Sequence, residues 1–130
     1  MADLYVIDTH VLIWYFTGSK RLKPALREKV DDIRNRNGRL LVPTIVLAEA
    51  LTIAEKGKVE FDFTAMQRVL HDEPEFEIIS FSPEIFQTVI QVRNVPELHD
   101  RIIVATARFY GAGILTKDRE ILESGEVKIL

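Results

Sequence analysis

Four carboxylates occupy positions where a charge needs an explanation: Asp8, Glu49, Asp100 and Asp118. Several carboxylates brought together cannot all stay ionised unless positive charge compensates them, and divalent cations supply that charge. Oxygen ligands in a chain without cysteine favour Mg²⁺ or Mn²⁺ over zinc. Such ions polarise a phosphate, lower the pKa of a bound water and steady a leaving oxygen. The four acids therefore indicate a metal site suited to phosphodiester hydrolysis.

Three of these acids also have a purely structural interpretation. Asp8 follows a short apolar run and precedes a helical pattern, so it could serve only as a helix cap. Asp118 could cap the turn that follows it. Asp100 lies in the first turn of a predicted helix, where the helix dipole and an arginine could stabilise it. Taken singly, none of the three identifies a catalytic site.

Glu49 carries the strongest physical argument. From Ile45 to Ala54 only Glu49 and Thr52 interrupt an apolar surface, so we predict a helix that is apolar nearly all round. The carboxylate then has little room to reach solvent. A buried carboxylate is costly unless it is paired, hydrogen-bonded or bound to metal. Glu49 therefore needs a partner, which a salt bridge or a metal site could supply.

Short apolar strands that alternate with helices must position these acids. Strands are predicted at 4–7, 40–42, 77–81, 113–115 and 127–129. Helices are predicted directly after Asp8, from Pro24 to about Asn37, from Pro43 to Lys56, from about 62 to 71, from Pro83, and from 98 to 110. Most of the strands lack in/out alternation. This pattern predicts a three-layer α/β fold, a mostly parallel central sheet flanked by helices, within one domain spanning 1–130.

In such sheets function gathers beyond the carboxyl ends of the strands. Asp8 and the run Thr116-Lys117-Asp118 both follow predicted strand ends. Since carboxyl ends of parallel strands share one edge of the sheet, we expect these residues to lie close together.

Composition and charge narrow the function classes. The 47% hydrophobic and 28% charged content fits a globular protein, and no apolar run approaches the roughly 18 residues that would span a bilayer. A signal peptide is not expected, because Asp8 and His10 break the first apolar run. We therefore expect a cytoplasmic protein with no membrane contact.

The net charge of −3 argues against a general nucleic-acid binder. The charge is segregated, however, because residues 20–39 hold eight basic side chains against three acidic ones. This segment is either a basic surface with a function or the solvated face of an amphipathic helix.

The motifs DTHVLIW around Asp8, VPTIVLAEA at Glu49, LHDRIIVATA at Asp100 and TKDREI at Asp118, in this order, resemble the PIN-domain nucleases, and among them the VapC-type toxins of toxin–antitoxin pairs. The resemblance covers nearly the whole chain. It implies a PIN-like fold and an Mg²⁺- or Mn²⁺-dependent endoribonuclease that cleaves RNA with metal-activated water. It also implies a homodimer and a cognate antitoxin that plugs the acidic groove, commonly with a basic side chain.

The resemblance also implies roles for individual residues. Asp8 and Asp100 would be direct metal ligands, Glu49 a ligand or a base acting through water, and Asp118 an outer or second-metal ligand. The hydroxyls of Thr9 and Thr116 would orient these carboxylates, or be plain turn and cap hydroxyls.

Other neighbours of the acids have open roles. Arg101 and Arg119 would contact substrate phosphate or neutralise the acids. His99 would be either a donor to a metal-binding carboxylate or a partly exposed histidine at a helix start. The basic 20–39 segment would flank RNA. One departure is that many relatives have a longer stretch before the third acid than VPELHDR.

Three alternatives use the same acids differently. A receiver-type phosphorylation domain requires adjacent acids after the first strand, whereas Asp8 is followed by Thr9. A haloacid-dehalogenase-like phosphatase requires a second Asp two residues after Asp8, and His10 occupies that position. The third alternative is a catalytically silent module whose acids recruit a basic partner. Four intact acids argue against that loss of activity.

Overall fold

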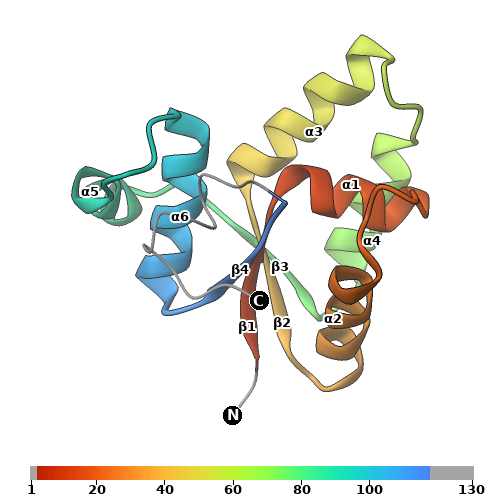
Figure 1. Ribbon diagram of the computed structural model, residues 1–130, viewed down its shortest axis with the longest axis horizontal. Coiled ribbons are helices and arrows are strands. Elements are labelled where there is room, and N and C mark those ends of the chain that lie inside the picture. The colour runs from red at the N-terminus through yellow and green to blue at the C-terminus, as the bar shows by residue number, and fades with distance from the viewer. Residues whose placement is uncertain (1–2, 118–130) are drawn as a thin grey trace.

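A parallel sheet forms the centre of the molecule, with helices on both of its faces (Figure 1). The computed structural model describes residues 3–117 of the chain. Its strands are β1 (Leu4–Ile7), β2 (Arg39–Pro43), β3 (Phe76–Ile79) and β4 (Gly113–Leu115), which lie in the order β3-β2-β1-β4. Every pairing is parallel. The predicted α/β fold class is confirmed.

The helices are α1 (Thr9–Thr17), α2 (Pro24–Asn35), α3 (Thr44–Lys56), α4 (Phe63–Asp72), α5 (Pro83–Gln91) and α6 (Leu98–Tyr110). Helices α5 and α6 lie on one side of the sheet and α1 to α4 on the other (Figure 1). The predicted starts of these helices lie within two residues of the observed ones, and so do the predicted ends of α2, α3, α4 and α6. The strand predicted at 127–129 lies outside the described residues. No described helix is long and apolar enough to cross a membrane.

Local chemistry explains where several helices begin and end. The Asp8 carboxylate accepts a hydrogen bond from the Thr9 amide at 2.7 Å and caps α1, and Ser82 caps α5 in a comparable way. Pro24 occupies the first turn of α2, where its missing amide hydrogen costs no helical bond. Gly57 ends α3 with a φ of 71°, a left-handed conformation that glycine adopts at little cost.

The core lies between the sheet and the two helical layers. Val6 and Ile7 of β1 and Leu40 of β2 are fully buried, as is Ile103 of α6. Burying side chains of this size contributes about 1.5–3 kcal/mol each relative to exposure. Because β1 and β2 are the central strands, both of their faces are covered, which explains why their sequences are apolar runs rather than alternating patterns.

Helix α3 differs from the helix predicted in this region. Only Val46 and Ala50 are fully buried, while Ala48, Leu51 and Thr52 are exposed, with Leu51 at 41%. The helix is apolar nearly all round, as its sequence indicates, but the described structure covers only part of its surface. The helix projects beyond the sheet (Figure 1), so an apolar sequence here leaves part of its surface uncovered.

The strand register brings together the two segments that follow β1 and β4. Ile7 pairs with Leu115, and the Asp8 amide donates to the Leu115 carbonyl at 3.0 Å. Asp8 and Thr116 therefore begin side by side at the carboxyl edge of the sheet, as expected from their positions after strand ends.

Candidate acidic site

Asp8 lies at the carboxyl end of β1 and has donors on both of its oxygens. Oδ1 accepts the Thr9 amide at 2.7 Å, and Oδ2 accepts the hydroxyl of Thr116 at 2.5 Å. Asp8 is only 7% exposed, and Thr9 and Thr116 are buried. Asp8 therefore caps α1 with one oxygen and contacts Thr116 with the other, so the helix cap and the site residue are the same carboxylate.

Thr9 connects Asp8 to Glu49 on α3. Its amide donates to Asp8, and its hydroxyl donates to Glu49 Oε1 at 2.5 Å. These two acids, from the start of α1 and the middle of α3, are thus held by one residue. The partner that Glu49 was predicted to need is first of all this hydroxyl.

His99 in the first turn of α6 approaches the same carboxylate from the other side of the sheet edge. Its Nε2 lies 3.2 Å from Glu49 Oε1. The direction falls short of a hydrogen bond, since Nε2 has no hydrogen-bond partner in the described structure, so the contact is an ion pair only when the imidazole is protonated. Because Thr9 and His99 both meet Oε1, Oε2 is the oxygen of Glu49 left for another ligand.

Asp100 lies beside His99 in the first turn of α6. The carboxylate of Glu97 caps this helix by accepting the amides of His99 and Asp100 at 3.2 and 3.1 Å. Glu97 could not be recognised as a cap from the sequence, because glutamate is not among the residues preferred at helix N-termini. Through this cap, Glu97 sets where α6 begins and thereby places both His99 and Asp100.

Burial and charge are unevenly divided between the two connected acids. Glu49 has a side chain that is 30% exposed, so the prediction that it has little access to solvent is wrong, and Asp8 is the buried acid instead. Burial raises the pKa of the Asp8 carboxyl above its ordinary value, and the negative charge of Glu49 raises it further. Hydrogen bonds from Thr116 and Thr9, and the nearby His10, act in the opposite direction on this pKa.

We refer to Asp8, Thr9, Glu49, His99 and Thr116 as the acidic site. No three described Asp, Glu or His side chains converge closely enough to form a metal cluster on their own. The donor chemistry nevertheless fits a hard divalent cation, because the acids are oxygen ligands and Asp8 is buried beside a second negative charge. Asp118 and Arg119, predicted for the same site, lie outside the described residues.

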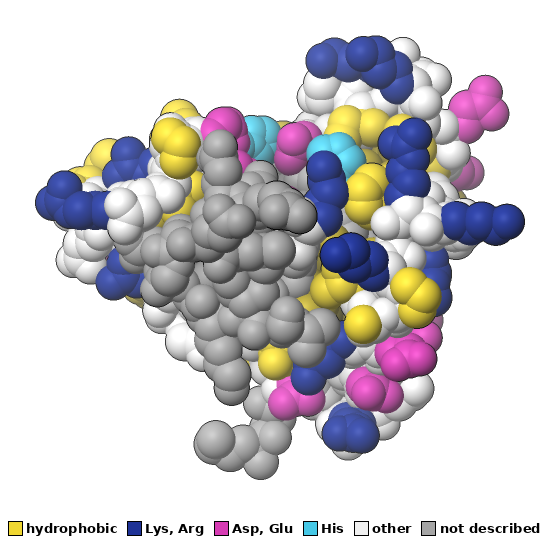
Figure 2. All heavy atoms as spheres, in the orientation of Figure 1, with side chains coloured by type: hydrophobic (Ala, Val, Ile, Leu, Met, Phe, Trp, Pro, Cys, Tyr) yellow, Lys and Arg dark blue, Asp and Glu magenta, His cyan; other side chains and the backbone are white. Residues whose placement is uncertain are grey.

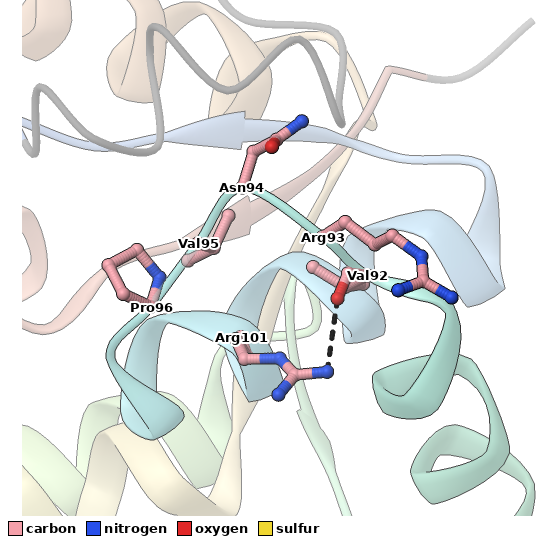
Figure 3. Close-up of a pocket in the computed structure, with 6 residues that line it drawn as sticks. All are labelled: Val92, Arg93, Asn94, Val95, Pro96 and Arg101. Carbon is pink, nitrogen blue, oxygen red and sulfur yellow. Dashed lines mark hydrogen bonds between the residues drawn. The ribbon is translucent and has the colours of Figure 1, made fainter.

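Arg101 is held away from the acids. Its Nη2 donates to the carbonyls of Val89 and Val92 at 2.7 and 3.0 Å, at the C-terminal end of α5 (Figure 3). The guanidinium lines a cavity of about 400 Å³ with residues 92–96. In this position it satisfies carbonyls that the end of α5 leaves open, and it fastens the loop between α5 and α6. The structure thus gives Arg101 a structural contact where a substrate contact was predicted as one of two roles.

Four of the eight basic side chains in the 20–39 segment contact other groups of the described structure. Arg34 donates to Glu75 at 2.9 Å, Arg39 to Glu77 at 3.2 Å, and Arg27 to the carbonyl of Ser19 at 3.1 Å. Lys29 lies over the ring of Tyr5. Much of the positive charge that looked available for a partner therefore stabilises α2 and its neighbours.

Comparisons with known proteins agree with this architecture. The family profile of the PIN domain matches residues 5–126. A search of curated protein sequences found no significant match.

Solved structures with a similar fold include the following three. VapBC2 from Rickettsia felis, bound to a promoter DNA fragment, is 16% identical with a TM-score of 0.75, covering 98% of this chain and 97% of that one. The sarcin-ricin loop cleaving toxin VapC20 from Mycobacterium tuberculosis is 16% identical with a TM-score of 0.70, covering 95% and 98%. A toxin-antitoxin complex from Klebsiella pneumoniae is 19% identical with a TM-score of 0.66, covering 97% and 95%.

At these identities the neighbours show a shared fold. The profile match spans both of the strand ends and all three of the helices that carry the acidic site. The chain therefore belongs to the PIN domain family.

Proposed function

We propose that this protein is a metal-dependent endoribonuclease, the toxin of a toxin–antitoxin pair, and that residues 1–130 form one nuclease domain. The observation that carries the proposal is the pairing of Asp8 and Glu49 through Thr9. Two acids are held together with one of them buried, and among the described residues the basic groups that act on them are His99 and His10. Such a pair of carboxylates carries an excess of negative charge, which a divalent cation would neutralise.

In this proposal Asp8, Asp100 and Glu49 hold Mg²⁺ or Mn²⁺, with Asp118 as an outer or second ligand. Bound there, the cation would lower the pKa of a water and polarise the scissile phosphate. The residues of the chain keep the acids in place. Thr116 and the Thr9 amide fix the Asp8 carboxylate, and the Thr9 hydroxyl fixes Glu49.

The proposal extends to partners. A cognate antitoxin would cover the acidic site with a basic side chain, and the active protein would be a homodimer in the cytoplasm. Membership of the PIN family supports this, as does the likeness to solved proteins described as toxin–antitoxin complexes.

The direct test is cleavage of labelled RNA by the purified chain with Mg²⁺, with Mn²⁺ and with EDTA. We expect cleavage with either cation, none with EDTA, and loss to background for Asp8→Asn and Asp100→Asn. The amide keeps the size of the side chain but removes the charge that holds the cation. Asp32→Asn on α2 is the matched control, because Asp32 is an exposed acid far from the acidic site in sequence, and it should cleave as the wild type does.

Cleavage that survives both Asp8→Asn and Asp100→Asn would overturn the assignment. A wild-type chain that binds the cation but cleaves no RNA would favour the silent interaction module. Growth arrest on expression, abolished by Asp8→Asn but not by Asp32→Asn, separates a toxin from a nuclease with a housekeeping role.

A further inference from the structure

A second concave site lies at the far end of α1 from Asp8. This cavity of about 240 Å³ is lined by Trp14, Thr17, Ser19, Arg21, Lys58 and Val59. It is formed where the C-terminal half of α1 meets the loop before α2 and the loop after α3. We call it the Trp14 cavity. It shares no residue with the acidic site.

The lining of the Trp14 cavity is basic and hydroxylic, with no carboxylate. Arg21 and Lys58 are exposed, and neither forms an ion pair with a described residue. Arg21 differs in this respect from two arginines of the same basic segment, because Arg34 pairs with Glu75 and Arg39 pairs with Glu77. Two uncommitted cations in one hollow are suited to an anionic ligand.

The floor of the cavity adds an aromatic surface. Trp14 is 9% exposed, so it presents only part of its indole. Thr17 and Ser19 add hydroxyls to the lining, and these bond the Trp14 carbonyl and the Arg21 amide. An aromatic ring, hydroxyls and cations together are the groups that bind the base, sugar and phosphate of a single-stranded nucleotide. Since so little of the ring is exposed, most of the affinity should come from the two cations.

The Trp14 cavity and the acidic site are connected along α1. His10, Trp14 and Thr17 follow one helical face, and the rise of the helix puts Thr17 about 13 Å from Asp8 along the axis. Lys117 bridges the two sites. Its Nζ lies 5.6 Å from the centroid of the Trp14 ring, and it directly follows Thr116, which donates to Asp8.

The surface shows the same arrangement. On the face in Figure 2, Lys and Arg side chains gather over the region of α1, beside the acidic and histidine side chains at the top of the molecule. A single strand of RNA that crosses the acidic site and continues over α1 would therefore pass from a region of negative charge to one of positive charge.

We propose that the Trp14 cavity binds a nucleotide of the RNA substrate a few positions from the scissile phosphate. Arg21 and Lys58 contact its phosphate, Trp14 contacts its base or sugar, and Lys117 contacts the backbone between this nucleotide and the acidic site. The proposal rests on RNA being the substrate, and it adds a subsite that acts in binding rather than in the chemical step.

The test measures binding of a labelled single-stranded RNA to the full chain in EDTA, across a series of salt concentrations. The key variant is Arg21→Ala with Lys58→Ala. The matched control is Arg36→Ala with Arg68→Ala, which removes the same charge from two exposed positions outside the cavity. Trp14 is the only tryptophan of the chain, so quenching of intrinsic fluorescence by RNA reports directly on the cavity.

We expect the key variant to bind RNA about tenfold more weakly at low salt. The slope of the logarithm of the binding constant against the logarithm of salt concentration should be smaller by about 1.4, as expected for two lost phosphate contacts to a single strand. Quenching of Trp14 should be lost with it. With Mg²⁺ present, KM should rise by a similar factor while kcat is unchanged. The thermal midpoint of the variant should match that of the wild type, because both side chains are exposed.

Three outcomes would overturn the proposal, and each points elsewhere. If the key variant binds RNA as the control does while the wild type cleaves RNA, the subsite is wrong and the nuclease assignment stands. If the wild type neither binds nor cleaves RNA, both proposals fail. If the key variant loses binding of a labelled polyglutamate peptide but not of RNA, the cavity is a site for an acidic protein segment.

Discussion

Two groups of charged side chains lie at opposite edges of the same parallel sheet, and they are balanced differently. At the amino edge, Arg34 donates to Glu75 at 2.9 Å and to the hydroxyl of Tyr15 at 3.1 Å, and Tyr15 in turn donates to Asp31. We call this the Arg34 network. Its guanidinium also lies over the rings of Tyr15 and Phe76, so the charge is both paired and packed.

At the carboxyl edge, the acidic site has hydroxyl and amide donors but no arginine. Asp8 and Glu49 share Thr9, and among the described residues the groups of opposite sign that act on them are His10 and His99. Within residues 3–117, the Arg34 network contains its own counter-charges, whereas no arginine or lysine pairs with Asp8 or Glu49 of the acidic site. An ionic cluster that lacks its counter-charge is the better candidate for binding something from outside the chain. The predictions below test this difference.

The largest expected effect is at Glu49. Glu49→Gln should reduce RNA cleavage to near background with normal folding, because the carboxamide can still accept the Thr9 hydroxyl but cannot supply a negative charge to a cation. Glu55→Gln, on the same helix but exposed, should retain full activity. Equal activity of the two variants in Mg²⁺ would show that Glu49 is not part of the metal site.

Thr116 should have the next largest effect. Thr116→Val keeps the shape of the side chain and removes the hydroxyl that donates to Asp8 Oδ2. Loss of a group that orients a metal ligand typically costs about 10–100-fold in metal affinity or activity. Titration of the variant with Mn²⁺ should show a weaker apparent affinity, and Thr52→Val on exposed α3 should not. An unchanged titration would reduce Thr116 to a packing residue.

The Arg34 network should respond in stability rather than in activity. Arg34→Ala leaves Glu75, whose side chain is 14% exposed, without its cation. An unsatisfied group of this kind costs about 1–3 kcal/mol, measurable by urea unfolding. Arg39→Ala removes a more exposed pair and should cost under about 1 kcal/mol. Cleavage per folded molecule should stay unchanged in both variants.

The smallest effect is a gain. Because burial raises the pKa of folded Asp8 above the unfolded value near 3.8, stability falls as pH rises through the folded pKa. Asp8→Asn removes this loss, so in EDTA the variant should melt a few degrees above the wild type at pH 7. The difference should shrink as the pH approaches 4. A variant less stable than the wild type at pH 7 would show that the Asp8 charge is already compensated.

The fold was predictable because its signals are local. The cap at Asp8, the proline at the start of α2 and the glycine after α3 mark element ends by backbone chemistry alone. The apolar runs of β1 and β2 then require a sheet covered on both faces. Only partners close in sequence, or an average apolar environment, are needed for these predictions.

The closeness of Asp8 and Thr116 was predictable, because both follow the ends of parallel strands, but the contacts around them were not. That Glu49 needs a partner follows from its helix, but Thr9 and His99 come from segments whose approach only the tertiary structure fixes. The burial of Asp8 and the exposure of α3 depend on how far each helix extends past the sheet, which no pattern in the sequence records. The contact of Arg101 with α5 was unpredictable for the same reason.

The hydrogen bond between Thr116 and Asp8 joins residues 108 positions apart. During synthesis, β1, β2 and β3 can pair while β4 is still unmade, but the second donor to Asp8 is supplied only when β4 adds to β1 at the edge of the sheet. Contacts so distant along the chain form late, because they close the longest loops. A chain that lacks β4 therefore keeps the Thr9 amide as a donor to Asp8 but loses the Thr116 hydroxyl.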